Sequence, residues 1–306
     1  TNDILFHALA MWWLALFFYW KMHDKKSWDW KKWTTIILGL GVLVWIKLTA
    51  FVLVLALVIW LLVYSIPKKY WKGLLVAVIV LVSVVAVYCP WLLPQHKSSG
   101  EAFTINSYEV EKDEHMPLGF FMRWDNSILG YPFWDRGRES FWSMFAVSTF
   151  LDYDNVFENY ESHEYGKGKV FETANGRYLS IQRVVEQSVA FWFSLPLLFF
   201  LFVGACIWLV RSVKSKLQNK DLFLGIVAAG LFASLVYNVW QYPFLERGTM
   251  KTIFILSFFP LLALLSSGAW YDVIKTNKYK TVFITLFWIY VGLWGLLNLN
   301  AIILPS

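Results

Sequence analysis

The sequence predicts an all-α polytopic membrane protein with about eight transmembrane helices and one large extracytoplasmic loop that contains short helices. Three observations lead to this class. Hydrophobic residues make up 58% of the chain and charged residues only 16%, whereas a soluble domain is about half apolar and a quarter charged. The apolar residues gather in runs long enough to cross a bilayer. The basic residues gather in every second connector between those runs.

Eight apolar runs are predicted to form the spanning helices. A span needs about 20 apolar residues, and somewhat fewer where long side chains at its ends reach the interface. The predicted spans are residues 4–20, 34–46, 48–66, 74–93, 188–210, 222–240, 252–271 and 281–300. They divide the chain into residues 1–93 with the first four helices, a loop over residues 94–187, and residues 188–306 with the last four.

Basic side chains mark one side of the predicted membrane protein. The first, third, fifth and seventh connectors hold 15 of the 27 lysine and arginine residues. Cytoplasmic connectors carry an excess of such residues, so these four are predicted to be cytoplasmic, and the net charge of +6 points to no nucleic-acid partner. Both termini of this segment and the 94–187 loop are then extracytoplasmic.

The membrane is predicted to be a bacterial plasma membrane. The 94–187 loop has no Asn-x-Ser/Thr glycosylation acceptor, which favours this membrane slightly over the endoplasmic reticulum. The second location stays open, and it would place the same loop in the lumen.

The 94–187 loop is predicted to be folded rather than a flexible linker. It holds nine basic and fifteen acidic residues together with many aromatic ones, and disordered segments are poor in aromatics. Phe141, Trp142, Phe145 and Thr149 have the spacing of a short helix with one apolar face, which could lie flat on the membrane surface. Residues 177–186 are predicted to form a helix that leads into the fifth span.

Lys47 interrupts the apolar stretch "GLGVLVWIKLTAFVLVLALVIW" at residues 39–60. An isolated ammonium at the centre of a bilayer costs roughly 2.5–3.5 kcal/mol. The apolar runs on either side are together too long for one helix, so the chain is predicted to turn near Lys47 at the outer face. Two interpretations remain open. The side chain is either a lysine that snorkels to the interface or a cation directed at an anionic headgroup.

Charged groups from several connectors are predicted to gather at the outer face. They include Asp3, Lys47 and a short connector with Glu246, Arg247 and Lys251. A lysine or arginine there could neutralise the phosphate oxygens of a substrate whose lipid tail stays in the bilayer. A carboxylate there could act as general base for an acceptor.

Signatures of common catalytic and metal sites are absent from the sequence. It contains no H-E-x-x-H, G-x-S-x-G, C-x-x-C or Walker pattern. The five histidines are scattered, so no metal site is predicted, and dependence on a divalent metal stays undetermined. Four charged residues of the long loop could either order that loop or bind an acceptor, namely Arg136, Arg138, Asp152 and Asp154. The residue pattern assigns no catalytic residue.

Four stretches resemble the later part of bacterial C-type (GT-C) glycosyltransferases, the superfamily of the protein O-mannosyltransferases and aminoarabinose transferases. They are "TNDILFHAL" at 1–9, "LGLGVLVWIKLTAFVL" at 38–53, "SFWSMFAVSTFLDYDN" at 140–155 and "GTMKTIFILSFFPLLALL" at 248–265. The order of these stretches spans nearly the whole chain.

The resemblance implies an inverting transferase that takes a sugar from a polyprenyl-phosphate-linked donor at the extracytoplasmic face. It implies that Lys47, Lys251 and Arg247 bind the donor phosphate and that Asn2 and Asp3 line the same cavity. The family's catalytic carboxylate lies in the first outer loop, which is expected upstream of this chain. The implied partners are the lipid-linked donor and membrane lipids, while the acceptor and any cofactor stay unassigned.

Two other functions stay open on the sequence alone. A transporter for a lipid-linked substrate would carry polar groups at mid-membrane and often an inverted repeat, whereas the predicted spans hold few charges and show no evident repeat. A structural subunit of a membrane complex would use the long loop to dock a partner. The 19 tryptophans suit the interfacial belts of any of the three.

Overall fold

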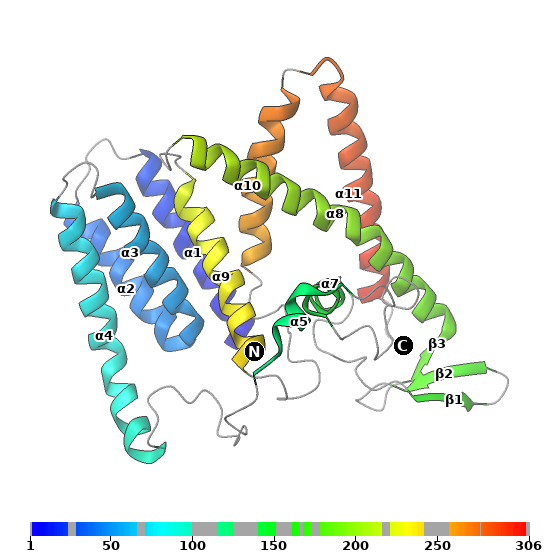
Figure 1. Cartoon of the computed structure of the whole chain (residues 1–306), viewed down its shortest axis with the longest axis horizontal. Coiled ribbons are helices and arrows are strands. Elements are labelled where there is room, and N and C mark those ends of the chain that lie inside the picture. The colour runs from blue at the N-terminus through cyan, green and yellow to red at the C-terminus, as the bar shows by residue number, and fades with distance from the viewer. Residues whose placement is uncertain are drawn as a thin grey trace. The chain divides into compact units, whose positions relative to one another are not determined.

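The structure is a computed structural model that describes residues 2–23, 29–65, 71–99, 115–124, 140–150, 161–165, 168–172, 178–215, 221–241, 257–275 and 277–303. The chain divides into two compact units (Figure 1). Unit 1 comprises Thr1–Glu109, Leu209–Val236 and Ile255–Leu265, and unit 2 comprises Val110–Trp208, Tyr237–Phe254 and Ser266–Ser306.

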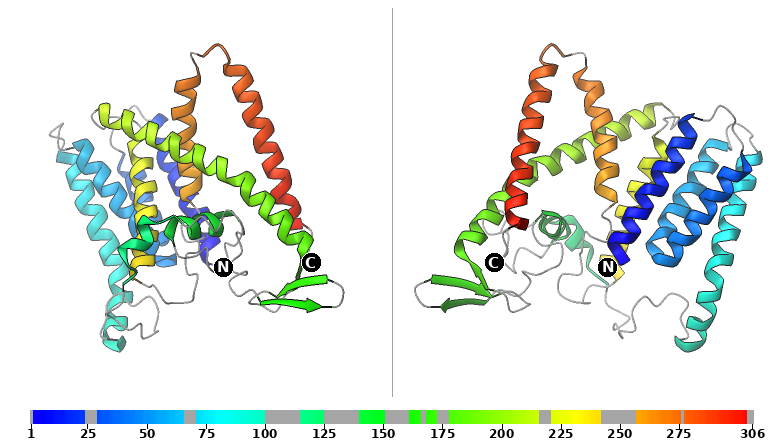
Figure 2. Two further views of the ribbon diagram at one scale, coloured as in Figure 1. Left: turned by 45° about the vertical axis from the view of Figure 1, so that its right-hand side comes forward. Right: turned by 180° about the vertical axis from the view of Figure 1, so that it is seen from behind.

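Unit 1 is a helical bundle. Its described elements are α1 (Asn2–His23), α2 (Trp30–Ile46), the 3₁₀ turn η1 (Leu48–Ala50), α3 (Phe51–Ser65), α4 (Trp71–Ser99), the end of α8 (Ile181–Lys214), most of α9 (Leu222–Gln241) and the first part of α10 (Phe258–Ile274). Helices α1 to α4 lie side by side and alternate in direction, as both views of Figure 2 show. Successive short connectors therefore fall at opposite ends of the bundle.

An aromatic cluster joins three helices of unit 1. The ring of Phe17 on α1 lies 4.8 Å from that of Phe223 on α9 and 5.7 Å from that of Trp60 on α3. Trp13 stacks on Phe17 at 5.9 Å. All four side chains are buried. Because aromatic side chains bury large apolar areas and pack with defined geometry, this cluster holds α1, α3 and α9 together.

Unit 2 combines helices with a small sheet. The helical elements are α5 (Leu118–Met122), α7 (Phe141–Phe150), most of α8 (Ile181–Lys214), the later part of α10 (Phe258–Ile274) and α11 (Lys280–Ile303). Strands β1 (Glu161–Tyr165), β2 (Gly168–Glu172) and β3 (Tyr178–Ser180) pair antiparallel in that order, with Glu161 opposite Glu172 and Val170 opposite Ser180. The sequence predicted short helices in this part of the chain but no strands. The predicted helix over residues 177–186 is wrong at Tyr178–Ser180, which form β3, and is confirmed from Ile181, where α8 begins.

The predicted helix over residues 141–149 is confirmed as α7, but its apolar face does not lie on a membrane surface. Phe141 and Phe145 are each 1% exposed, and Phe145 lies 6.3 Å from Phe202 of α8. Trp142 donates a hydrogen bond to the carbonyl of Phe121 on α5 at 3.0 Å. The expectation of a surface-bound face is therefore wrong, because α5 and α8 cover that face inside unit 2.

In the part of the chain that the structure describes, four helices are long and apolar enough to cross a membrane. They are Trp71–Pro90 in α4, Val189–Lys214 in α8, Leu222–Trp240 in α9 and Lys280–Leu297 in α11. Leu5–Trp20, Phe51–Val63 and Phe258–Ile274 are shorter apolar helices. This pattern is compatible with an integral membrane protein.

Each predicted span overlaps a helix, although some helix ends differ from the prediction. Helix α4 continues to Ser99, and α8 begins at Ile181. The span number of eight, the large 94–187 loop and the orientation stay predictions. The same holds for the division of the chain at residues 93 and 187.

Candidate functional site

Lys47 lies at a break between two helical elements. Helix α2 ends at Ile46, where the N–H of Lys47 donates to the carbonyl of Leu43 at 3.0 Å. The backbone of Lys47 is extended (φ −157°, ψ 132°), and its carbonyl accepts from the N–H of Ala50 at 3.0 Å to open η1. The predicted break of the chain near Lys47 is thereby confirmed, while its position at the outer face stays a prediction.

The surroundings of Lys47 favour an interaction with an anion. The side chain is half-buried, and this burial lowers the pKa of Lys47 from 10.5 to about 8. The indole of Trp45 donates to the carbonyl of Val87 on α4 at 2.9 Å, which holds the end of α2 in place. A partly desolvated ammonium on a fixed backbone has lost some hydration and gains more from a nearby anion than an exposed one.

The first turn of α1 lies at about the same level of unit 1 as Lys47. Helices α1 and α2 run in opposite directions and are joined by a hydrogen bond from the indole of Trp13 to the carbonyl of Ile36 at 3.0 Å. Lys47 is eleven residues after Ile36, and Asp3 is ten residues before Trp13. Both helices rise about 1.5 Å per residue, so these two positions are level. Asn2 and Asp3 therefore belong to the same end as Lys47, while their side chains lie outside the described part.

The Lys47 end of unit 1 also contains a buried histidine, His7, which the sequence analysis did not predict as a site residue. His7 is 2% exposed, and its Nδ1 lies 2.9 Å from the hydroxyl of Ser257. The N–H of Ser257 also points at Nδ1, at 3.4 Å. A ring that accepts this bond at Nδ1 carries its proton on Nε2 when neutral. Ser257 immediately precedes α10, so the contact joins the second turn of α1 to the start of α10.

The position of His7 in the sequence was enough to suggest a functional role. His7 stands one helical turn after Asp3 in an otherwise apolar run. Ionisable residues inside apolar spans are costly and usually serve a function, so such a residue merits a site assignment by itself. Its partner Ser257 is 250 residues away and left no trace in the local pattern.

Described residues of three of the four stretches predicted to resemble the transferases lie at this end of unit 1. His7 and Ser257 bring residues 1–9 into contact with residues 248–265. The break at Lys47 adds residues 38–53. The fourth stretch, residues 140–155, contributes α7 to unit 2.

The remaining predicted site residues lie outside the described residues. They are Arg247 and Lys251 in the connector before Ser257, and Arg136, Arg138, Asp152 and Asp154 in the long loop. Their roles stay predictions. Lys251 precedes Ser257, the hydrogen-bond partner of His7, by six residues in the sequence.

The basic connectors of unit 1 lie at the end opposite Lys47. Lys31 and Lys32 lie in the first turn of α2, and Lys72 lies in the first turn of α4. Helix α2 runs along the bundle from Trp30 to Ile46, so Lys31 and Lys47 lie at its opposite ends. Lys47 is thus separate from the lysines that define the predicted cytoplasmic side.

The described residues contain no group of three or more histidine, cysteine, aspartate or glutamate side chains that could hold a metal ion. Comparison with protein-family models, with curated proteins and with solved structures gave no match. The site at this end of unit 1 therefore consists of a half-buried ammonium, a buried imidazole and the polar first turn of α1. Such a set can bind an anionic group and hold a proton beside it.

Proposed function

We propose that the protein is a membrane glycosyltransferase that moves a sugar from a polyprenyl-phosphate-linked donor to an acceptor at the extracytoplasmic face of a bacterial plasma membrane. The observation that carries this proposal is the position of Lys47. It is half-buried at a helix break, level with Asn2 and Asp3, and opposite the basic connectors. The resemblance of three converging stretches to GT-C transferases supports the same function.

The proposed reaction is a direct displacement at the anomeric carbon. An acceptor hydroxyl oxygen attacks this carbon while a base takes the hydroxyl proton, and the bond from the carbon to the phosphate oxygen breaks. The electron pair of that bond stays on the phosphate oxygen, whose negative charge grows as the bond lengthens. Lys47, with Lys251 and Arg247, stabilises this charge. We assign the base to no residue of this chain.

These cations act more in the transition state than in donor binding. The donor carries one negative charge on its phosphodiester before the reaction, and the leaving lipid phosphate carries more. Interactions that strengthen as this charge develops raise the turnover number. Asn2 and Asp3 line the donor site in this proposal, and Arg136, Arg138, Asp152 and Asp154 either order the long loop or contact the acceptor.

Replacing Lys251 by alanine tests the proposed function. We expect Lys251→Ala to lower the turnover number about 100-fold and to change the affinity for the polyprenyl-phosphate-linked sugar donor much less. The measurement is sugar transfer and binding of the lipid-linked sugar donor by the full-length protein and its variant in nanodiscs. Lys72→Ala, at the opposite end of unit 1, is the matched control and should leave both quantities unchanged. An unchanged turnover number for Lys251→Ala would remove this residue from the mechanism.

The protein would be a transporter if it bound the donor and moved the lipid across the bilayer but transferred no sugar. Absence of both donor binding and transfer would favour a structural subunit. Sugar transfer and donor binding are read in nanodiscs, and lipid movement is read with the same protein in sealed vesicles, so these measurements separate the three functions.

A further inference from the structure

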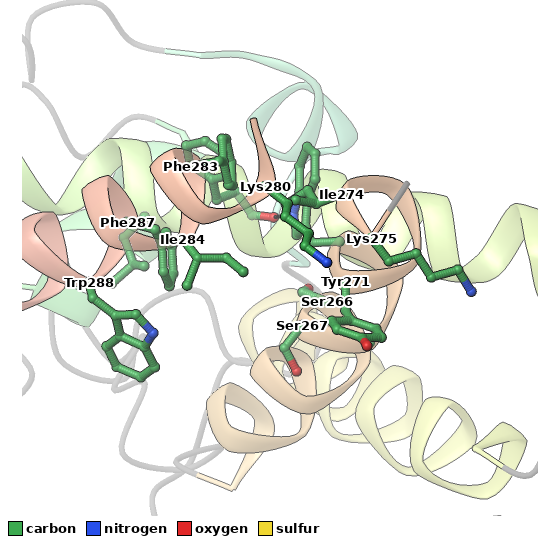
Figure 3. Close-up of a pocket in the computed structure, with 14 residues that line it drawn as sticks. Ser266, Ser267, Tyr271, Ile274, Lys275, Lys280, Phe283, Ile284, Phe287 and Trp288 are labelled. Atoms are coloured by element: carbon green, nitrogen blue, oxygen red, sulfur yellow. Dashed lines mark hydrogen bonds between the residues drawn. The ribbon is translucent and has the colours of Figure 1, made fainter. Parts of the chain in front are cut away.

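Unit 2 contains an apolar groove between α8, α10 and α11, with a volume of about 510 Å³ (Figure 3). Aromatic side chains from all three helices line it, namely Phe200, Trp270, Tyr271, Phe283, Phe287 and Trp288. A volume of this size falls in the range of pockets that hold small-molecule ligands. The groove is therefore large enough to hold part of a lipid molecule.

Two separate attachments on α8 keep α10 and α11 apart and so create the groove. The indole of Trp270 on α10 donates to the carbonyl of Phe200 at 3.0 Å. The indole of Trp294 on α11 donates to the hydroxyl of Ser194 at 2.6 Å. Ser194 and Phe200 are six residues apart, which is about 9 Å along a helix. The aromatic side chains between these attachments line the groove without closing it.

Helix α11 leaves the groove open on its outer side. None of the residues in its apolar span, Lys280–Leu297, is buried within the described structure. A helix this apolar on all sides suits a lipid environment, because lipid replaces the protein neighbours it lacks. The groove then opens towards the acyl chains of the bilayer.

Lysines gather at the end of the groove where α10 turns into α11. Lys275 and Lys280 line the groove, and Lys278 lies in the turn between them. Lys275 pairs with Asp272 at 2.8 Å, whereas no described acidic side chain pairs with Lys280. In Figure 3 the side chain of Lys280 extends into the space between α10 and α11, and that of Lys275 points away from it. The mouth of the groove therefore has an excess of positive charge.

We propose that this groove binds an anionic phospholipid. Its acyl chains lie along the aromatic walls, and its phosphate is held by Lys280. The hydroxyls of Ser267 and Tyr271, which also line the groove, suit the polar glycerol region. Basic pockets between membrane helices on the cytoplasmic side are sites of this kind, and the 275–280 connector is one of those predicted to be cytoplasmic. The proposal is independent of the transferase site, because none of the residues that line the groove is assigned to that site.

Lipid retention by the full-length native protein tests the proposal. The protein is equilibrated with vesicles of equal parts phosphatidylglycerol and phosphatidylcholine, and the retained lipids are counted by native mass spectrometry. We expect retention of phosphatidylglycerol over phosphatidylcholine. Lys280→Ala should lower this preference about 5-fold, because one lysine near an anionic lipid surface contributes about that factor.

A substitution that fills the groove tests the acyl-chain part separately. A Cβ added to Gly268, which lines the groove, meets nothing within 4 Å, so a side chain can begin there without a backbone clash, and Gly268→Leu adds apolar volume at the groove. Gly292 on α11 has the same open surroundings but does not line the groove, so Gly292→Leu is the matched control. Lys214→Ala, at the end of α8, is the matched control for charge.

Excess inorganic phosphate is added to distinguish binding of a phospholipid headgroup from binding of a free phosphate ion. We expect it to leave phosphatidylglycerol retention largely intact, because the acyl chains contribute to binding. The proposal is supported if Gly268→Leu and Lys280→Ala lower retention and both controls do not. It is overturned if Gly268→Leu retains as much phosphatidylglycerol as the native protein, or if inorganic phosphate alone displaces the lipid.

Discussion

Replacing Lys47 by alanine is expected to lower the rate of sugar transfer by about 10²- to 10³-fold in the full-length native protein. The ammonium of Lys47 is held at a fixed helix break and is partly desolvated, so its charge acts strongly on a phosphate beside it. The fold should survive, because the hydrogen bonds that shape the break come from the backbone. Single-turnover transfer with saturating donor measures the effect.

Lys47→Arg and the pH profile provide the control for this effect. Burial lowers the pKa of Lys47 to about 8, so the ammonium is present below this pH and is lost above it. In the native protein, kcat/KM should therefore fall as pH rises through about 8. Arginine keeps its charge throughout this range, so Lys47→Arg should not show this fall. Equal transfer rates for Lys47→Ala and the native protein would contradict the role of Lys47. The same fall of kcat/KM near pH 8 in Lys47→Arg as in the native protein would also contradict it.

Replacing Gly204 by alanine is expected to lower the free energy of unfolding by about 1–3 kcal/mol. Gly204 of α8 packs directly against Ser266 of α10. A Cβ at Gly204 would lie 2.6 Å from the Cβ and 2.8 Å from the Cα of Ser266. Neither of these atoms can move away without shifting the α10 backbone, and small residues are what allow such close helix packing in membranes. Thermal or denaturant unfolding of the purified protein in nanodiscs measures the change.

Gly268→Ala is the matched control for Gly204→Ala. It adds the same methyl group to α10 at a position where the new Cβ meets nothing within 4 Å. The higher helix propensity of alanine should leave stability unchanged or raise it by about 0.5–1 kcal/mol. If Gly204→Ala were as stable as Gly268→Ala, the close contact between α8 and α10 would be contradicted.

Apolar run length was enough to predict where the helices lie, because an apolar run long enough for a bilayer satisfies its backbone groups only as a helix. The break at Lys47 was likewise predictable, since a single charge divides an otherwise apolar stretch. The strands β1 to β3, in contrast, could not be predicted from the sequence. Their sequences, "ESHEY", "GKVFE" and "YLS", do not alternate clearly between apolar and polar residues, and antiparallel pairing depends on partners elsewhere in the chain.

The candidate site was predictable only in part for a similar reason. Lys47, Asn2 and Asp3 were singled out by charge and by resemblance, and the packing of α1 on α2 places them at one level. The contact of His7 with Ser257 and the burial of α7 against Phe202 depend on tertiary pairing, which local patterns do not contain. The groove in unit 2 was missed because α11 is apolar all round, so no face of it stood out.

The most direct test of the proposed transferase site is a cryo-EM map of the complete native protein in nanodiscs with polyprenyl phosphate added. The proposed site predicts density for the lipid phosphate within about 3–4 Å of the Nζ atom of Lys47, beside the first turn of α1. A map in which Lys47 points into bulk water, with no lipid density near the start of α1, would contradict it. Lys47 would then be a lysine that anchors a helical hairpin at the interface.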